Sequence, residues 1–301
     1  MMSTAPAHAL RPRRSVLYLP GSNARALEKA RLLPADALIL DLEDAVAPDA
    51  KDTARQQIAA AVGAKSFGSR EVVVRINGLA TPWGEADLAA IAAAGPDAIL
   101  IPKVETGGDI LAAGRHLEAL DTTRSIALWA MMETPAAIFN AETIARARRE
   151  PHGGRFTALV MGTNDLAKET RARLVPGRTP MLTALSLCVL AARSHGLDIL
   201  DGVFTAIKDQ EGLRRECIEG RELGMDGKTL IHPDQIAIAN EAFAPAADEV
   251  ALARQIIAAF AAPEAKGKGV LTVEGKMVER LHAEIAARIV AIADAIAART
   301  A

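Results

Sequence analysis

The chain has little net charge, no long uncharged apolar run and no apolar stretch after its basic amino-terminal segment. These three features exclude broad classes of function. The formal net charge is −2, so there is no basic excess of the kind that binds the phosphate backbone of nucleic acid. No uncharged apolar run reaches roughly 18 residues, the length that spans a bilayer. The basic amino-terminal segment MMSTAPAHALRPRR is not followed by an apolar stretch. We therefore expect no secretory signal, no membrane association and a cytoplasmic protein.

Cysteine and aromatic residues are also scarce. The two cysteines, Cys188 and Cys217, lie in helix-like stretches without metal-binding spacing, which predicts ordinary buried thiols in a reducing compartment. Aromatic residues make up 3% of the chain but hydrophobic residues make up 50%, so aliphatic side chains must fill a large core. The nucleotide-binding patterns GxGxxG and GxxxxGK[ST] are absent. No Ser-His-Asp, Cys-His or GxSxG arrangement stands out either.

Short apolar runs alternate with amphipathic helical stretches through about residue 243. The runs are SVLYLPG, ALILDLED, VVVRING, AILIPKVE, ALWAMMET, ALVMGTND, LDILDGVF and KTLIHP. Fully apolar strands between such helices favour a parallel sheet that is covered on both faces. Eight strand-helix units in this length predict a closed (β/α)8 TIM barrel over residues 1–243. A doubly wound open sheet is the alternative, but it usually has a Gly-rich turn after its first strand.

Residues 244–301 read as a C-terminal extension of the barrel. The segment DEVALARQIIAAFAAPEAKGKG predicts a helix that ends in a Lys-Gly stretch, and LHAEIAARIVAIADAIAART predicts a closing helix. Between them, VLTVEGKMVE predicts a small hairpin about Glu274 and Gly275. Such an extension either seals the base of a barrel or acts as a lid over a mouth, that of a neighbouring subunit included.

Most of the apolar runs end in charged residues. These are Glu43 and Asp44, Arg75, Lys103 and Glu105, Glu133, and Asp165. Because side chains alternate along a strand, a polar residue at its end lies at a rim. In a barrel all the carboxyl-terminal rims meet at one functional face. A mouth with several carboxylates and one arginine suits a divalent cation together with an anionic substrate.

Glu133 and Asp165 end the fifth and sixth predicted strands, which are neighbours in a barrel. Two such carboxylates can share one Mg²⁺, which keeps waters for a substrate to displace. The alternative is that both cap helices or pair with surface arginines. Alternation points Arg75 into the mouth, where it can grip a substrate carboxylate in bidentate fashion. The alternative for Arg75 is a structural ion pair with Glu43 or Asp44.

Other polar residues of the predicted barrel have less specific interpretations. Lys103 and Glu105, in IPKVET, suggest an internal pair on the fourth strand. His232, in IHP at the end of the eighth strand, is a candidate acid-base group or a hydrogen-bonding support, and support is the preferred interpretation. His195 precedes Gly196 and is expected at the end of a helix.

Seven ordered segments resemble one known family. They are RSVLYLPGSN, LILDLEDAVAPDAKDTAR, VVVRINGL, ILIPKVE, METPAAI, MGTNDLAKE and GKTLIHPDQI, and KGKGVLTVEGKMVE extends the likeness into the tail. The chain resembles the citrate lyase beta-subunit-like acyl-CoA lyases of the HpcH/HpaI aldolase/citrate lyase superfamily, which include malyl-CoA and citramalyl-CoA lyases. The resemblance implies a TIM barrel, a homotrimer or a dimer of trimers, and a Mg²⁺-dependent Claisen or retro-Claisen reaction on a CoA thioester.

The resemblance also implies roles for residues of the mouth. Glu133 and Asp165 match the magnesium ligands, and Arg75 matches the residue that holds the carboxylate of the 2-oxo or 2-hydroxy acid. Glu43 and Asp44 match the acidic pair near the waters of the metal. Magnesium bound to the substrate hydroxyl would acidify it and stabilise the oxyanion.

Two further groups of residues are assigned by the resemblance. Arg14, Ser15 and Asn23 lie where the family accommodates the CoA. The family delivers a proton from an aspartate of the tail, on a lid lent by a neighbouring subunit. Here the matching position, in GKMVE, is Glu279, a carboxylate that is longer by one methylene.

The expected function is therefore that of a carbon-carbon lyase. It would cleave or form a 3-hydroxyacyl-CoA such as malyl-CoA or citramalyl-CoA, with acetyl-CoA and a 2-oxo acid (glyoxylate, pyruvate or oxaloacetate) as the other partners. Three alternatives stay open: a malyl-CoA thioesterase, a citrate lyase beta subunit that acts on citryl-ACP, and a catalytically impaired CoA-binding scaffold. Glu279 is the residue that keeps the thioesterase and the scaffold in consideration.

Overall fold

Eight parallel strands close into a barrel in sequence order, and β8 pairs with β1. The structure is a computed structural model that describes residues 11–123 and 125–300. The strands are β1 (Ser15–Pro20), β2 (Ala37–Asp41), β3 (Glu71–Arg75), β4 (Ala98–Ile101), β5 (Ala127–Met132), β6 (Phe156–Met161), β7 (Asp198–Asp201) and β8 (Gly227–Leu230). The predicted (β/α)8 barrel is confirmed, and the closed sheet excludes the doubly wound alternative.

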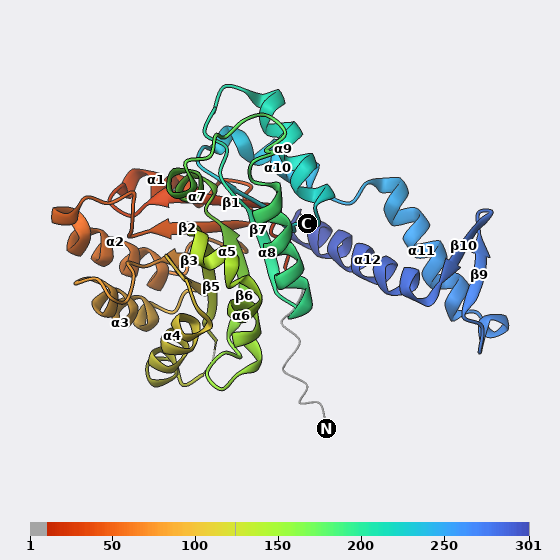
Figure 1. Ribbon diagram of the computed structural model, residues 1–301, viewed down its shortest axis with the longest axis horizontal. Coiled ribbons are helices and arrows are strands. Elements are labelled where there is room, and N and C mark those ends of the chain that lie inside the picture. The colour runs from red at the N-terminus through yellow and green to blue at the C-terminus, as the bar shows by residue number, and fades with distance from the viewer. Residues whose placement is uncertain (1–10, 124, 301) are drawn as a thin grey trace. The chain divides into compact units, whose positions relative to one another are not determined.

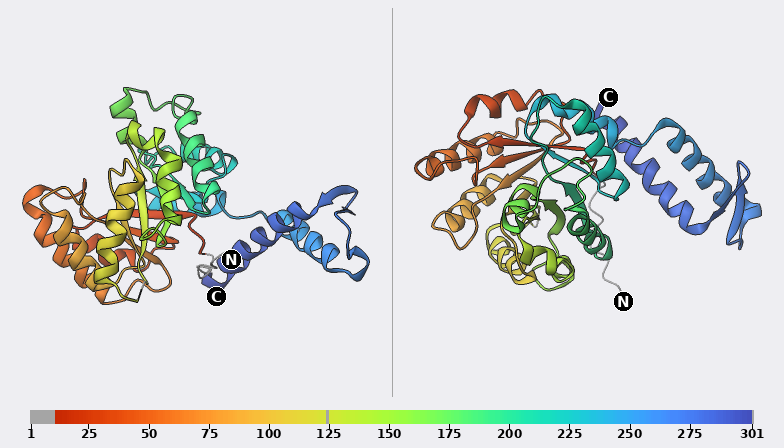
Figure 2. Two further views of the ribbon diagram at one scale, coloured as in Figure 1. Left: turned by 60° about the horizontal axis from the view of Figure 1, so that its bottom comes forward. Right: turned by 45° about the horizontal axis from the view of Figure 1, so that its top comes forward.

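Helices ring the strands on the outside (Figures 1 and 2). They are α1 (Ala24–Ala30), α2 (Lys51–Gly63), α3 (Gly84–Ala94), α4 (Gly107–Leu120), α5 (Pro135–Phe139), α6 (Ala141–Arg146), α7 (Thr163–Thr170), α8 (Leu182–Ser194), α9 (Gln210–Glu222) and α10 (Ile236–Ala242). Because strand side chains alternate, one set fills the barrel axis and the other packs under the helices. The axial set includes Val16, Ala37, Ile39, Val73, Ala98, Leu100, Trp129, Met131, Ala158, Val160 and Leu200.

Charged side chains close the axis at the amino-terminal ends of the strands. Arg13 donates to both oxygens of Glu71 at 2.7 Å and also pairs with Asp198. Its guanidinium carbon lies 4.8 Å from the ring centre of Trp129. Since Trp129 belongs to the axial set, this cluster plugs the base of the barrel below the apolar core.

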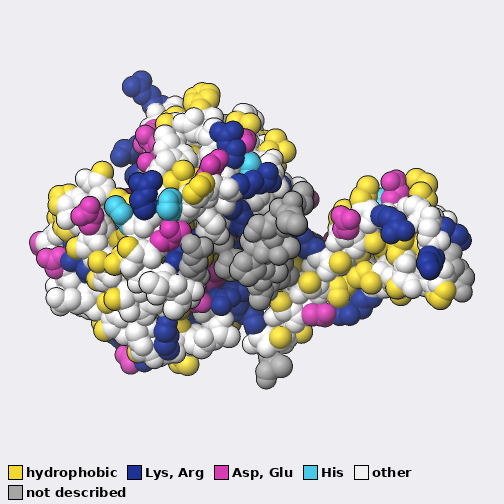
Figure 3. Space-filling view, turned by 90° about the horizontal axis from the view of Figure 1, so that it is seen from below, with side chains coloured by type: hydrophobic (Ala, Val, Ile, Leu, Met, Phe, Trp, Pro, Cys, Tyr) yellow, Lys and Arg dark blue, Asp and Glu magenta, His cyan; other side chains and the backbone are white. Residues whose placement is uncertain are grey.

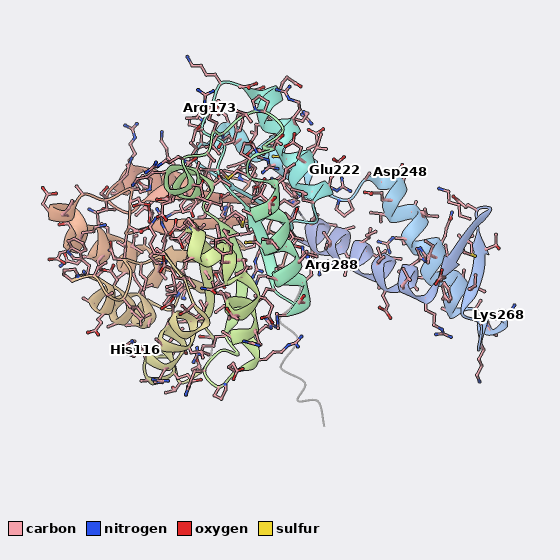
Figure 4. All side chains as sticks on the ribbon, viewed as in Figure 1. His116, Arg173, Glu222, Asp248, Lys268 and Arg288 are labelled. Carbon is pink, nitrogen blue, oxygen red and sulfur yellow. The ribbon has the colours of Figure 1, made fainter. Side chains whose placement is uncertain are left out.

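A second buried charge cluster lies behind β7 and β8. Lys228 and Asp201 are each 0% exposed, and the Lys228 ammonium contacts Asp201 and Glu216. Arg178 donates to both oxygens of Asp201 at 2.8 and 2.7 Å. Arg178 belongs to the loop between α7 and α8, which also carries Arg173, labelled in Figure 4. The cluster therefore ties this irregular loop to the barrel wall.

The chain folds as two compact units, a barrel unit, Arg13–Phe243, and a second unit that contains the residues from Ala244 onward. The second unit consists of α11 (Ala247–Ala261), the antiparallel pair β9 (Val270–Val273) and β10 (Lys276–Glu279), and α12 (Arg280–Thr300). Helices α11 and α12 pack against each other around a small apolar core. Glu274 and Gly275 have φ values of 47° and 76°, as a two-residue hairpin turn requires. The predicted helices and hairpin of the extension are confirmed.

Both cysteines are free and buried, as the sequence predicted. Burial raises the pKa of each thiol to about 12, so neither is a ready nucleophile. Acidic and basic side chains are interspersed over the face shown in Figure 3. Among the described residues, no helix has both the length and the apolar character needed to cross a bilayer.

One buried ion pair at the base provides a test of how the barrel is held together. Asp121 is 7% exposed and accepts hydrogen bonds from Thr123, the Ile126 amide and Arg155. Asp121→Asn leaves the Arg155 guanidinium without its counter-charge. We expect the free energy of unfolding to fall by about 3–5 kcal/mol, as when one partner of a buried pair is removed. Urea denaturation at pH 7 measures this.

The matched control is Asp52→Asn. Asp52 pairs with Arg55 at 2.8 Å, but its side chain is 79% exposed, so the loss should stay below about 1 kcal/mol.

Burial opposes the ionisation of Asp121, yet its three hydrogen bonds lower the pKa to about 2. The unfolded value is about 3.9, so this contribution is present above that pH and is lost as the pH falls toward 2. A difference between wild type and Asp121→Asn that does not shrink over this range would contradict the assignment.

Candidate active site

A pocket of about 320 Å³ opens at the carboxyl-terminal ends of the strands. Its lining includes Tyr18, Asp41, Asp44, Arg75, Met131, Glu133, Met161, Gly162, Thr163, Asn164, Asp165, Val203 and Thr229. The structure thus brings four of the candidate residues, Asp44, Arg75, Glu133 and Asp165, into one cavity although they are far apart in sequence. Parallel closure of the strands is what makes their ends meet.

Arg75 ends β3 and points into the pocket, where it is held by Asp41. Its Nε and Nη2 each donate to Asp41 at 2.7 Å, a bidentate pair. Asp41 and Arg75 are register partners at the ends of β2 and β3. The guanidinium carbon also lies 5.2 Å from the ring centre of Tyr18. These contacts fix the plane of the guanidinium at the mouth.

Glu43 and Asp44 lie on the other side of the same guanidinium. Arg75 Nη1 is 2.7 Å from a Glu43 oxygen and 3.3 Å from an Asp44 oxygen, so the structural ion pair that the sequence left open is present. Burial raises the pKa of Glu43 to about 8; the Arg75 charge opposes the shift, and the neighbouring carboxylates add to it.

The loop that carries Glu43 is fixed from behind. Lys51 is 6% exposed, and its ammonium donates at 2.7 Å to the carbonyl oxygens of both Leu42 and Glu43. Asn77 donates to the Leu42 carbonyl at 3.0 Å and is itself held by the buried Asp87. Since Lys51 and Asn77 hold backbone oxygens, the Glu43 carboxylate is left to pair with Arg75.

Glu133 follows β5 directly and is 0% exposed. Its Oε1 accepts a hydrogen bond from the Lys103 amide at 2.8 Å. Its Oε2 is buried without a hydrogen-bond partner among the described residues. Burial raises the pKa of this carboxyl group. A Cβ at Gly162 would come within 2.3 Å of the Glu133 Cβ and 2.9 Å of Oε2, so this glycine makes the space in which Glu133 lies.

Asp165 lies in the first turn of α7, four residues beyond β6 rather than at the strand end. The Lys103 ammonium is 2.8 Å from Asp165 Oδ1 and 3.5 Å from Glu133 Oε1. The expected Lys103–Glu105 pair on a strand is wrong, because β4 ends at Ile101 and Lys103 contacts these two carboxylates instead. Burial alone would lower the pKa of Lys103. The hydrogen bond to Asp165 and the nearby carboxylates outweigh burial and raise this pKa above its ordinary value, so the ammonium stays charged.

Glu133 and Asp165 are the pair in the pocket that best fits a metal. Both lie against one cationic group, Lys103, and Glu133 offers a buried oxygen with no hydrogen bond. Hard carboxylate oxygens suit Mg²⁺, which typically takes one or two protein carboxylates. Within the described part of the chain, no cluster of three or more His, Cys, Asp or Glu side chains is arranged to hold an ion. A two-carboxylate site completed by substrate and water is therefore what these residues support.

Arg14 and Ser15 lie at the other end of β1, near the base of the barrel. Arg14 forms an ion pair with Asp36 at 2.8 Å. Ser15 is 0% exposed, donates to Asn240 at 2.7 Å and accepts from the Asp36 amide at 3.1 Å. Because their polar groups are used at the end opposite the pocket, we correct their expected place in substrate binding and assign them to the barrel framework.

Asn23 and the two histidines have local roles in the structure. Asn23 follows the carboxyl-terminal end of β1 and caps α1 by accepting from the Ala26 amide at 3.0 Å. His232 caps the turn after β8 by accepting from the Asp234 amide, which agrees with a supporting role. His195 ends α8, as expected.

Glu279 belongs to the second unit and ends β10. Its register partner across the hairpin is Val270, so both side chains lie on one face, which also carries Met277. Val270 and Met277 are 48% and 68% exposed. The opposite face of the hairpin packs Val273 and Val278 into the small core of this unit. Glu279 thus lies on an open, partly apolar face.

Sequence reasoning missed Asp41, the main partner of Arg75. The signal was present, because Ala37 and Ile39 belong to the axial set and Asp41 has the same parity on β2. It also missed Tyr18, which shares its face of β1 with the axial Val16. The supports Lys51 and Asn77 carry no comparable signal, since their roles depend on where a helix and a loop are placed.

Comparisons with known proteins identify the family to which the chain is similar. The sequence model of one protein family, described as HpcH/HpaI aldolase/citrate lyase, matches residues 14–233. A (3S)-malyl-CoA thioesterase of Cereibacter sphaeroides (strain ATCC 17025 / ATH 2.4.3) is 51% identical over 292 residues, which cover 97% of this chain and 98% of the relative. The citrate lyase subunit beta of Escherichia coli (strain K12) is 35% identical over 89% of each chain.

A solved structure shares the fold over nearly the whole chain. It is the protein CitE from Mycobacterium tuberculosis in complex with magnesium, acetoacetate and coenzyme A, at a TM-score of 0.71 and 27% identity, and it covers 93% of this chain and 97% of that chain. The thioesterase relatives overturn the expectation of a carbon-carbon lyase. At 51% identity over almost the full length, they favour the thioesterase that the sequence left as an alternative.

Gly162→Ala tests whether the pocket depends on the space around Glu133. The added Cβ would have to displace Glu133 or the start of α7, and such overpacking costs about 1–3 kcal/mol. We expect a lower free energy of unfolding by urea denaturation and a shifted Glu133 side chain in a crystal structure. Gly154→Ala is the control, because a Cβ there meets nothing within 4 Å. Equal stability of the two variants would contradict this view of the pocket.

Proposed function

The chain belongs to the HpcH/HpaI aldolase/citrate lyase family, and we propose that it is a thioesterase that hydrolyses a short 3-hydroxyacyl-CoA of the malyl-CoA type. Its resemblance to citrate lyase beta-like proteins is confirmed by the family match over residues 14–233, and the family is one of enzymes. The similarity to (3S)-malyl-CoA thioesterases along 97% of the chain carries the proposal. The 35% identity to a citrate lyase beta subunit gives weaker support to the alternative of a citrate lyase beta subunit that acts on citryl-ACP.

We propose Mg²⁺ as the cofactor, held by Glu133 and Asp165. The unpartnered Glu133 oxygen and the proximity of Asp165 support this site, and the structural relative CitE is described in complex with magnesium. When bound, such an ion acts as a Lewis acid toward substrate oxygens and fixes their orientation.

The protein groups around this site supply orientation and proton transfer. Arg75, with its plane set by Asp41, presents positive charge to the free carboxylate of the substrate. Asp44 and Glu43 complete the acidic side of the mouth, and burial raises the pKa of Glu43 to about 8, a value that suits proton transfer near neutral pH. Asn23, at the carboxyl-terminal end of β1, is our proposed contact on the CoA side.

Hydrolysis also needs a base for the attacking water, and we assign that role to Glu279. The carboxylate accepts the water proton as the oxygen bonds to the thioester carbon, and the C–S bond then breaks to release the CoA thiolate. The open face around Glu279 supports a lid that covers the mouth of a neighbouring copy. Large apolar side chains are exposed beside it, with Met277, Leu281 and Ile285 at 68%, 51% and 54%. A homotrimer or a dimer of trimers is the assembly that we propose.

The products of (3S)-malyl-CoA distinguish hydrolysis from carbon-carbon cleavage. With Mg²⁺ the protein should release malate and free CoA thiol, detected by mass spectrometry and a thiol reagent, and EDTA should abolish the reaction. Glu133→Gln should lower kcat/KM by about a hundredfold or more, because the metal contributes several kcal/mol.

The control for this assay is Gly154→Ala, which lies outside the pocket and should act like the wild type. Glyoxylate and acetyl-CoA as the main products would contradict the thioesterase. No turnover of any short 3-hydroxyacyl-CoA would leave the citrate lyase beta subunit that acts on citryl-ACP and the CoA-binding scaffold.

Glu279→Gln tests the general base. We expect kcat to fall about a hundredfold to ten-thousandfold, the usual contribution of a positioned proton acceptor, with an unchanged melting temperature. Glu274→Gln, in the turn of the same hairpin, is the matched control and should keep full activity.

Mixing the two inactive variants, Glu133→Gln and Glu279→Gln, shows whether the lid acts on a neighbour. In mixed oligomers some mouths combine an intact Glu133 with an intact Glu279 from another copy, so activity should return. Failure to recover activity after subunit exchange has been demonstrated would contradict the shared site.

A further inference from the structure

Lys103 contacts the two proposed metal ligands, Glu133 and Asp165, through both its backbone amide and its side-chain ammonium. Its amide donates to Glu133 Oε1 at 2.8 Å, and its ammonium lies 3.5 Å from that same oxygen. The ammonium also donates to Asp165 Oδ1 at 2.8 Å. One residue therefore bridges two carboxylates, one just after β5 and one on α7.

The backbone of Lys103 adopts an unusual conformation where it makes these contacts. Its φ is 51°, in the left-handed region that residues with a side chain seldom occupy. Such strained residues persist when the surrounding structure holds them in place, and they cluster at functional sites. Here the strained residue is the one that directs both an amide and an ammonium to Glu133.

The three side chains differ in how freely they can move. The Glu133 side chain is 0% exposed, whereas those of Lys103 and Asp165 are 39% and 32% exposed. Lys103 has four methylenes between its backbone and its charge, so the ammonium can move to solvent while its amide stays on Glu133. The ammonium is thus the removable part of the cluster, and Glu133 is the fixed part.

We propose that the Lys103 ammonium and the divalent cation compete for the same carboxylates, so that Lys103 sets the metal affinity of the site and leaves it when the ion binds. The inference rests on the magnesium site of the proposed function. An ammonium and a metal ion near one pair of oxygens repel each other strongly at short range. The ammonium offsets part of the negative charge of the two carboxylates, and the strained amide keeps Glu133 in place for the ion.

Magnesium affinity tests this directly, without any enzymatic assay. In isothermal titration calorimetry of the full chain, Lys103→Met should bind Mg²⁺ at least about tenfold more tightly, since a competing charge is gone. Lys103→Arg keeps the charge and should stay near the wild-type affinity. Lys103→Gly removes the side chain and suits the positive φ, so it should tighten binding even if Lys103→Met folds poorly.

Lys168→Met is the matched control for the loss of a positive charge. Lys168 lies on α7 with Asp165 but is exposed, whereas the cation in contact with the two carboxylates is Lys103. Its removal should change the affinity by less than about twofold, because exposed charges are screened by solvent and salt. Equal tightening in Lys168→Met and Lys103→Met would show a general charge effect and overturn the proposal.

Glu133→Gln separates failure of this inference from failure of the metal site. If the wild type binds Mg²⁺ and Glu133→Gln does not, but Lys103→Met binds no more tightly than the wild type, competition is overturned and the metal site stands. If the wild type binds no Mg²⁺, both the metal site and the competition are overturned.

Discussion

The mouth of the barrel contains more negative charge than the protein itself balances, and the rest of the site is arranged around this surplus. Four carboxylates and one guanidinium line the pocket. Arg75 is shared among Asp41, Glu43 and Asp44, while Lys103 is shared between Glu133 and Asp165. Like charges held close in a partly buried space resist ionisation together. Burial raises the pKa of Glu43 to about 8, and the neighbouring carboxylates add to this shift. A divalent cation would offset the surplus of negative charge.

Local sequence patterns predict the barrel but only part of its mouth. The alternation of apolar runs and helices marks all eight strands, and the parity that directs Arg75 inward also places Asp41. Local sequence patterns do not predict the partners of Lys103, because these contacts depend on a left-handed residue after β4 and on where α7 begins. For Arg14 and Ser15, in contrast, the sequence led to an expected place in substrate binding that the structure corrects. They lie in the segment RSVLYLPGSN, which carries part of the family resemblance, yet the strand direction puts them at the base. A motif alone therefore does not tell which end of a strand is functional.

The difference between the expected lyase and the proposed thioesterase has a physical basis. In either reaction the enzyme must hold a 3-hydroxyacyl thioester by its hydroxyl, carboxylate and carbonyl oxygens, so the residues that hold it carry no information about which bond breaks. That choice depends on what reaches the thioester carbon and when water is admitted. The group that we propose to activate the water is Glu279, which belongs to the second unit. Overall similarity along the whole chain therefore separates the two reactions better than the shared motifs do.

The plug of Arg13, Glu71 and Asp198 beneath Trp129 has a kinetic implication. Because this cluster fills the lower end of the barrel axis, ligands enter and leave the pocket through the opening at the carboxyl-terminal ends of the strands. In the proposed hydrolysis the CoA thiol and the small diacid form from one thioester inside the pocket, and the long thiol then lies between the diacid and the opening. Departure would then follow a fixed sequence, the bulky thiol first and the small diacid second, and added thiol would slow the escape of the acid without competing for its subsite.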